Sequence, residues 1–318
     1  MGPTVYVVAF LLSLSVIPML TESHVVIDVL FFTLLYAFLS TAWNIQSGFC
    51  GQYSVGHAAF LGIGAYTTAI LYTRLGISPW LGLWVGAGMA ALFALAIGFP
   101  TFRLRGYYYI LATLAVAEVL RTFFLAWDFT GRSLGIAYPL TEDSFWDLQF
   151  HTSRAPYFYI MLAFLICSVL ISHWIRYSKF GLNLLSIRED EDAAQSLGIN
   201  PFRHKMAATA LSAGLTGIGG ALLAQFNLFI EPDTLMSLHV SADILLPSLV
   251  GGIGTVWGPV AGSFILQPLS WILRLGLGSD VIHIIIRGIL LMVIVAIIPR
   301  GVVATVIERY VRPRLIKR

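Results

Sequence analysis

The charged segment 186–205, SIREDEDAAQSLGINPFRHK, carries four consecutive acids: Glu189, Asp190, Glu191 and Asp192. Acidic side chains are favourable where a helix begins, because the N-terminal end of the helix dipole is positive. Ala193 and Ala194 would continue such a helix, and Gly198 would end it. The segment therefore predicts a short separate helix. This helix could be a solvated connection, or its small residues and charged flanks could dock on another protein.

Catalytic chemistry has no comparable pattern in the chain. The sequence contains no G-x-x-x-x-G-K-[ST] motif, and no lysine follows a glycine, so a nucleotide phosphate has no loop of the usual kind. The seven histidines lack metal-ligand spacing. Cys50 and Cys167 lie far apart and indicate no disulfide framework. We therefore predict a chain that is not an enzyme, with no metal site and no cofactor of its own.

Several polar or ionisable residues fall inside or beside apolar runs. Glu118 and Arg121 are three positions apart in AVAEVLRTFF, so they share a helix face and predict an intramembrane ion pair, although they could also line a pathway. His57 is either a hydrogen-bonded interior histidine or a substrate contact. Asn44 either caps a helix or lines a cavity. Charges at membrane depth are costly, and they therefore mark candidate functional positions.

The composition shows what must position these residues. Of 318 residues, 58% are hydrophobic and only 11% are charged, and the mean hydropathy is +0.84. Soluble domains carry about 25% charged residues. A chain so poor in charge cannot cover its own surface against water, so it is predicted to be an integral membrane protein.

The apolar runs have the length of membrane-spanning helices, which need about 20 residues. They predict an all-α bundle of about ten crossings in a single domain, 1–318. The third and eighth runs could be interrupted or re-entrant. The runs lie near 4–20, 25–45, 54–73, 80–99, 107–126, 157–175, 206–229, 240–256, 258–274 and 281–299.

The distribution of basic residues predicts the orientation. Most of the 19 Lys and Arg residues fall in 100–106, 176–205 and 300–318, which share one side if all ten runs cross. The opposite side holds Arg74, Arg132, Arg154 and Arg274. Basic loops remain cytoplasmic. Both termini and the segment 186–205 are therefore predicted to be cytoplasmic.

Four motifs together resemble the permease subunits of branched-chain amino-acid ABC importers of the LivM type. The similarity extends from about residue 40 to residue 300. The motifs are NIQSGFCGQYSVGHAAFLGIGAY, FRLRGYYYILATLAVAEVLR, SIREDEDAAQSLGINPFRHKMAATALSAGLTGIGGAL and GGIGTVWGPVAG.

This resemblance implies a bacterial inner-membrane permease with a type-II-importer-like helical bundle. Its implied partners are a homologous second permease, with which it forms a heterodimer, two cytoplasmic ABC ATPases, a periplasmic binding protein and the lipid bilayer, but no nucleic acid. ATP and Mg would be bound by the ATPases. This chain would then form half of a translocation pathway for branched-chain or other hydrophobic amino acids.

The resemblance also assigns a role to the segment 186–205. Asp192, Ala193, Ala194 and Gly198 match the ABC importer coupling motif, in which Glu-Ala-Ala is followed by Gly after three residues, with Asp here in place of Glu. Arg188 and the acids 189–191 would flank this coupling helix in a cleft of the ATPase.

The substrate and its route are less specified. The solute is expected to pass between this chain and its sister, near Asn44, Ser54, His57 and Glu118. Related importers carry amides, urea or aromatic acids, so these remain alternatives. An ATP-independent carrier or channel is a further alternative, as is a structural scaffold that moves no solute.

Overall fold

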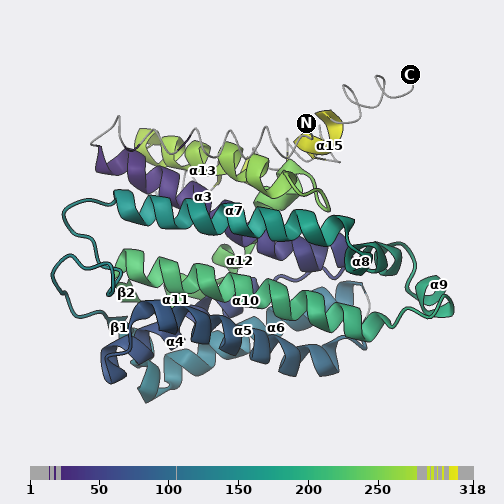
Figure 1. Cartoon of the computed structure of the whole chain (residues 1–318), viewed down its shortest axis with the longest axis horizontal. Coiled ribbons are helices and arrows are strands. Elements are labelled where there is room, and N and C mark those ends of the chain that lie inside the picture. Colours follow the sequence, from purple (N-terminus) through teal and green to yellow (C-terminus); the bar gives the residue numbers. More distant parts are fainter. Residues whose placement is uncertain are drawn as a thin grey trace.

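The computed structural model describes residues 23–104, 106–277 and 301–306 and a few single positions: Leu14, Pro18, Ile285, Ile286, Gly288, Ile289, Met292 and Ala296. In this part, the chain is a bundle of helices with one pair of two-residue strands (Figure 1). The principal helices are α3 His24–Asn44, α4 His57–Leu75, α5 Pro79–Thr101, α6 Tyr107–Ala126, α7 Ala155–Tyr177, α8 Lys179–Glu189, α9 Glu191–Ser196, α10 Pro201–Asn227, α11 Pro232–Leu235, α12 Leu238–Gly251, α13 Gly258–Leu277 and α15 Val302–Val306.

The long helices form two groups around a central helix. Figure 1 shows α3, α7 and α13 along one side of the bundle and α4, α5 and α6 along the other. The central helix, α10, packs against α4, α5 and α3 and is buried along most of its length. α12 contacts α13, α3 and α4. The bundle core therefore runs along α10, and α6 is the most exposed of the spanning candidates.

The two ends of the bundle differ. At one end, strand β1 Ile136–Ala137 pairs antiparallel with β2 Phe229–Ile230, and the 3-10 turns Asp128–Thr130 and Arg132–Leu134 precede them. α8 and α9 lie at the opposite end (Figure 1). The loop 127–154 and the charged segment 186–205 are therefore on opposite sides of any membrane that the bundle crosses.

Most of the predicted runs correspond to helices. Six segments of the described chain are long and apolar enough to cross a membrane, so the chain is a multi-pass membrane protein: His24–Phe49, Pro79–Thr101, Tyr107–Ala126, Ala155–Tyr177, Pro201–Asn227 and Pro232–Gly251. The runs 4–20 and 281–299 lie almost wholly outside the described residues. The total of about ten crossings stays a prediction.

The third and eighth runs have different outcomes. The third is one continuous helix, α4, of 19 residues. The eighth is α12, whose 14 residues measure about 21 Å at 1.5 Å per residue. A bilayer core is about 30 Å thick, so α12 alone is too short to cross it. α12 fills the first part of the run 240–256, and a turn occupies 252–257. With α11 before it, α12 belongs to the 20-residue span candidate Pro232–Gly251, so whether this run crosses stays a prediction.

Small residues allow the core helices to approach closely. A Cβ on Gly64 of α4 would clash with the backbone of Gly217 in α10, and a Cβ on Gly220 would clash with the carbonyl oxygen of Leu61. In lipid, such close backbone contact provides dispersion and weak hydrogen bonds in place of the hydrophobic effect. The contact between α4 and α10 therefore depends on glycine on both helices.

We expect Gly64→Ala to destabilise the permease by about 1–3 kcal/mol, because the added methyl group forces α4 away from α10. The measurement is the thermal unfolding temperature of the purified protein in detergent. Gly88→Ala is the matched control, since no atom lies within 4 Å of a Cβ at Gly88 in α5. Equal unfolding temperatures for the two variants would show that the close contact contributes nothing.

Candidate functional site

The short helix α9 begins at a side-chain cap. The Asp190 carboxylate oxygen Oδ1 accepts hydrogen bonds from the backbone N–H groups of Asp192 and Ala193, at 3.0 and 2.9 Å. Asp190 has an extended backbone and thereby separates α9 from α8. Glu191 and Asp192 occupy the first turn, where their charges are favourable towards the helix dipole. The acidic run therefore starts the helix, and Asp190 is the residue that caps it.

α9 ends in a Schellman motif at Gly198. The N–H of Gly198 donates to the Gln195 carbonyl oxygen at 2.9 Å, and the N–H of Ile199 donates to the Ala194 carbonyl oxygen at 3.1 Å. Gly198 has a φ of +83°, which glycine adopts without steric cost. Ala194 is buried against the bundle, whereas Ala193 is exposed and Leu197 is 81% exposed. The outward face of α9 therefore carries small and apolar side chains beside its acids.

Depressions lie on both sides of α9. One, of about 700 Å³, is bordered by Cys50, Gly106 and the residues 187–192. The other, of about 810 Å³, is bordered by Glu191, Gln195 and the residues 198–202. α9 therefore projects from the bundle between two depressions, and a partner could bind around it. We call this projection, α9 with Leu197 and Gly198, the knob.

An ion pair between a buried lysine and a partly exposed glutamate holds α9 on α10. Lys205 Nζ lies 2.7 Å from Glu191 Oε2, and the Lys205 side chain is only 1% exposed. Sequence reasoning missed Lys205, because the chain reverses at Asn200–Pro201 between the two partners. Asn200 caps α10 by accepting a hydrogen bond from the N–H of Arg203 at 3.1 Å. α9 is thus held on α10 by an ion pair and by a tight, capped turn.

Arg188 contacts the bundle at the base of α9, although the residue is exposed, and its predicted place beside an ATPase stays a prediction. Its Nη1 donates to the carbonyl oxygen of Gly48 at 2.6 Å. Gly48 lies in the π-helical turn Ile45–Phe49 that continues α3. A Cβ at Gly254 would clash with Nη1 of Arg188, so the turn between α12 and α13 also contacts this side chain. Arg188 therefore joins α8 to two interruptions of the bundle helices.

Asn44 connects the same two interruptions. Its Nδ2 donates to the Thr255 carbonyl oxygen at 2.8 Å, and its Oδ1 accepts from the Gly254 N–H at 2.8 Å. The side chain is fully buried. Asn44 was expected near the pathway, and the structure gives it the geometry of a joint between α3 and the α12–α13 turn.

His57 and Ser54 belong to one buried network. His57 Nδ1 lies 3.3 Å from Ser54 Oγ, and Nε2 lies 2.9 Å from Ser212 Oγ of α10. Ser212 Oγ in turn donates to the Ala42 carbonyl oxygen at 2.7 Å. His57 is completely buried and has hydrogen-bond partners on both ring nitrogens, as expected of an interior histidine. Ser54 also borders a small cavity, of about 20 Å³, between α4, α5, α6 and α10.

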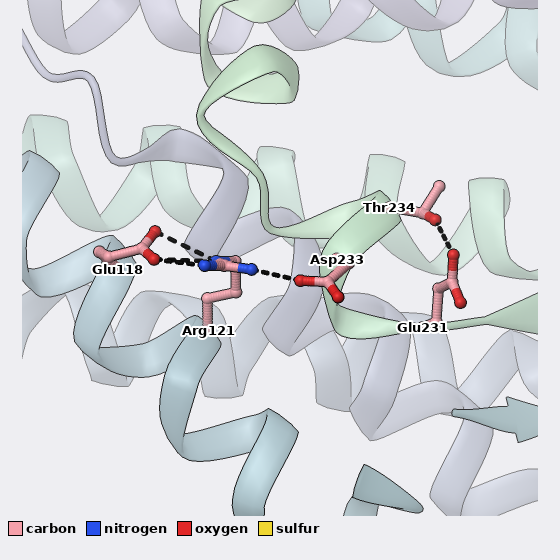
Figure 2. A network of polar contacts seen from close by, with 5 residues as sticks. All are labelled: Glu118, Arg121, Glu231, Asp233 and Thr234. Atoms are coloured by element: carbon pink, nitrogen blue, oxygen red, sulfur yellow. Dashed lines mark hydrogen bonds and ion pairs between the residues drawn. The ribbon is translucent and has the colours of Figure 1, made fainter. Parts of the chain in front are cut away.

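Glu118 lies apart from these residues, on the exposed side of α6. It forms an ion pair with Arg121, and Arg121 also forms an ion pair with Asp233 of α11. Figure 2 shows Arg121 between the two carboxylates, with the Thr234–Glu231 hydrogen bond beside them. Asp233 was not predicted, because nothing local marks an acid so distant in sequence. A partner or water must cover this cluster, since Glu118 and Asp233 are 52% and 59% exposed.

The loop at the β1–β2 end is held by hydrogen bonds. Trp80 Nε1 donates to the Phe145 carbonyl oxygen at 2.8 Å. Hydrogen bonds from the Thr152 side chain and from the backbone of His151 and Thr152 hold the pKa of Asp143 below its usual range. Trp146 and Leu140 are 74% and 76% exposed. This loop therefore presents apolar side chains on a fixed scaffold.

The four predicted pathway residues are thus not brought together. Asn44 joins two interruptions, Ser54 and His57 share a network, and Glu118 lies in the charged cluster on α6. Their common role in a pathway stays a prediction. Within the described ranges, no group of three or more His, Cys, Asp or Glu side chains could hold a metal ion.

Comparisons with known proteins agree on one family. A family model described as "Branched-chain amino acid transport system / permease component" matches residues 25–295. The high-affinity branched-chain amino acid transport system permease protein LivM of Escherichia coli (strain K12) is 29% identical over 290 residues, which cover 83% of this chain and 68% of LivM. No solved structure matches the chain.

More distant relatives are permeases of other transport systems, or a different permease of the branched-chain amino acid system. The L-arabinose transport system permease protein AraH of Escherichia coli (strain K12) is 28% identical, covering 76% of this chain and 73% of AraH. The branched-chain amino acid permease protein LivH of the same organism is 22% identical, covering 84% of this chain and 90% of LivH. The chain is thus similar to permeases for chemically different solutes.

Proposed function

Because the chain belongs to the branched-chain amino acid transport system / permease component family, we propose that it forms half of a translocation pathway for branched-chain or other hydrophobic amino acids. It is a membrane permease subunit of an ABC importer. Its relatives are transport components rather than catalysts. Transport is driven by ATP hydrolysis on partner subunits, which bind the ATP and Mg.

The observation that carries this proposal is the knob formed by α9. It lies at the opposite end from β1 and β2 (Figure 1), and it is held to the bundle by the pair Glu191–Lys205. Its outward face presents Ala193 and Leu197 between depressions. A partner that moves such a knob moves α10 and α8 with it. α9 is therefore the coupling helix, and the ATPase is its partner.

The remaining partners follow from the same scheme. The similarity to LivH as well as LivM supports a homologous sister permease and hence a heterodimer. The scaffolded loop 127–154, with its exposed Trp146 and Leu140, is the surface for a periplasmic binding protein. In this arrangement the chain lies in a bacterial inner membrane, with the β1–β2 end outside and both termini in the cytoplasm.

A related importer for amides, urea or aromatic acids would share all of these partners. It is distinguished by the solute that its binding protein holds. An ATP-independent carrier or channel would move solute after reconstitution without any ATPase, and would tolerate substitutions on the outward face of α9.

We expect Leu197→Asp to abolish co-purification of the ATPase subunits with the permease, because it places a charge on the apolar face of the knob. Leu140→Asp is the matched control: Leu140 is also highly exposed, but it lies at the β1–β2 end. The control should keep the ATPases and reduce only stimulation of hydrolysis by the binding protein. Retention of the ATPases by Leu197→Asp, with normal transport, would remove α9 from the coupling role.

A further inference from the structure

A polar cavity lies between α3, α12 and α13, away from the knob. It has a volume of about 220 Å³ and is bordered by acidic, basic, amide and aromatic side chains. We propose that this cavity binds a zwitterionic amino acid with an apolar side chain. The inference rests on the proposed function and gives it a solute site.

The cavity presents both signs of charge. Asp243 of α12 and Arg274 of α13 border the same space. Both side chains also interact with other groups of the protein, so a ligand shares or replaces those contacts. The ligand's ammonium group lies at the Asp243 carboxylate and its carboxylate lies at the Arg274 guanidinium. Ionisable side chains within membrane helices commonly mark substrate routes for this reason.

Gln267 provides an unused donor beside these charges. Its side chain is 5% exposed, and its Nε2 has no hydrogen-bond partner in the described chain. Gln267 borders the cavity on the same helix as Arg274. A buried amide donor without a partner is costly, and a bound carboxylate would satisfy it. Gln267 and Arg274 therefore bind the same end of the ligand.

The aromatic side chains supply the apolar wall. Phe32 and Tyr36 of α3 and Trp271 of α13 border the cavity, and the rings of Phe32 and Trp271 lie 6.2 Å apart between centroids. An aliphatic side chain packs against this surface. An uncharged sugar has neither an ammonium nor a carboxylate group for Asp243 and Arg274. A site with buried polar groups rejects ligands that leave those groups unpaired.

The cavity lies on the route that the proposed orientation requires. Asp243 is in the first half of α12, and Arg274 is close to the end of α13, so both are nearer to the β1–β2 end than the α12–α13 turn is. A solute released outside therefore reaches this cavity before it reaches the joint at Asn44.

The test is photo-crosslinking of a diazirine analogue of leucine to the assembled importer in nanodiscs, with the adducts mapped by peptide mass spectrometry. We expect adducts on the cavity wall at Phe32, Tyr36 or Trp271, with competition by leucine and none by L-arabinose. Gln267→Leu should reduce these adducts roughly tenfold, because it removes the donor at similar volume. Asp243→Asn should also reduce the yield of these adducts, because it removes the negative charge that faces the ammonium group, independently of Gln267.

Ile272→Ala is the control, since Ile272 neighbours Trp271 but is 67% exposed. Co-purification of the ATPases shows that each variant is folded. ATP-driven leucine uptake by the wild type with adducts elsewhere, or with adducts unchanged in Gln267→Leu and Asp243→Asn, overturns the cavity assignment alone. If the wild type takes up no amino acid and forms no adducts, the proposed function is overturned as well. Adducts in the cavity of an importer that moves a different amino acid support the site and refute only the branched-chain assignment.

Discussion

Arg188→Ala is expected to leave the ATPase subunits attached and hydrolysing ATP, while solute transport falls roughly tenfold to a hundredfold. The loss follows from the hydrogen bond between Arg188 Nη1 and the Gly48 carbonyl oxygen, at 2.6 Å. Hydrogen bonds to charged groups contribute about 1.5–3 kcal/mol, which corresponds to that range of rates if the bond is needed in one conformation only. The variant therefore distinguishes attachment of the ATPases from the coupling of ATP hydrolysis to solute transport.

The physical reason is a continuous set of contacts. α8 carries Arg188 next to α9, and Arg188 contacts both the π-helical turn of α3 and the α12–α13 turn. Asn44, at the end of α3, in turn forms hydrogen bonds with Gly254 and Thr255 of the α12–α13 turn. A displacement of α9 therefore reaches two interrupted helices at once. Interrupted helices commonly border the substrate sites of transporters, so such a displacement would be felt there.

The measurement compares ATP hydrolysis with uptake in proteoliposomes that contain the full importer. Arg188→Lys keeps the charge but not the planar guanidinium, and should recover only part of the transport. Arg203→Ala is the matched control, since Arg203 is an exposed arginine at the same end of the bundle. Loss of the ATPases from Arg188→Ala would instead place Arg188 in the docking surface, as the resemblance to the coupling motif first implied.

Glu191→Ala is expected to have the largest effect on stability. It leaves the Lys205 ammonium group, whose side chain is 1% exposed, without its carboxylate. Removing one partner of a fully buried ion pair costs about 3–5 kcal/mol, because the remaining charge is uncompensated. The Glu191 side chain is 25% exposed, so we expect a loss at or below the lower end of this range. The thermal unfolding temperature of the purified permease should fall accordingly, and α9 should separate from α10.

The double variant Glu191→Leu with Lys205→Met tests this explanation. Replacing both partners by apolar residues removes the uncompensated charge, and stability should return to near that of the wild type. Glu189→Ala is the control for the loss of an acid, since Glu189 is exposed. If Glu191→Ala and Glu189→Ala unfold at the same temperature, the pair does not hold α9 in place.

Local signals predicted the limits of α9, whereas its attachments could not be predicted. Acids at a helix start and glycine at a helix end act within a few residues, so Asp190 and Gly198 lie where the pattern placed a boundary. The pair Glu118–Arg121 likewise follows from three-residue spacing. The bond from Arg188 to Gly48 joins positions 140 apart, and no pattern in one sequence reports such a contact.

The polar residues of the apolar runs show a second limit. Asn44 and His57 stand out in sequence because a membrane helix rarely carries them without a reason. The reason can be a solute or an internal bond, and only the packing of neighbouring helices distinguishes the two. Ser212 and Gly254, which bond to these side chains, lie far from them in the sequence, and nothing local marks them as partners. No sequence pattern marked Gln267, because what distinguishes it is a buried Nε2 donor without a hydrogen-bond partner in the described chain.

The cluster Glu118–Arg121–Asp233 has a consequence for supply. A copy without partners keeps two half-exposed carboxylates in this cluster, Glu118 on α6 and Asp233 on α11. Hydrocarbon tolerates such charges poorly, so we expect a copy without a covering subunit to be less stable in a membrane. We therefore expect the chain to accumulate poorly when it is overproduced without a subunit that covers these charges.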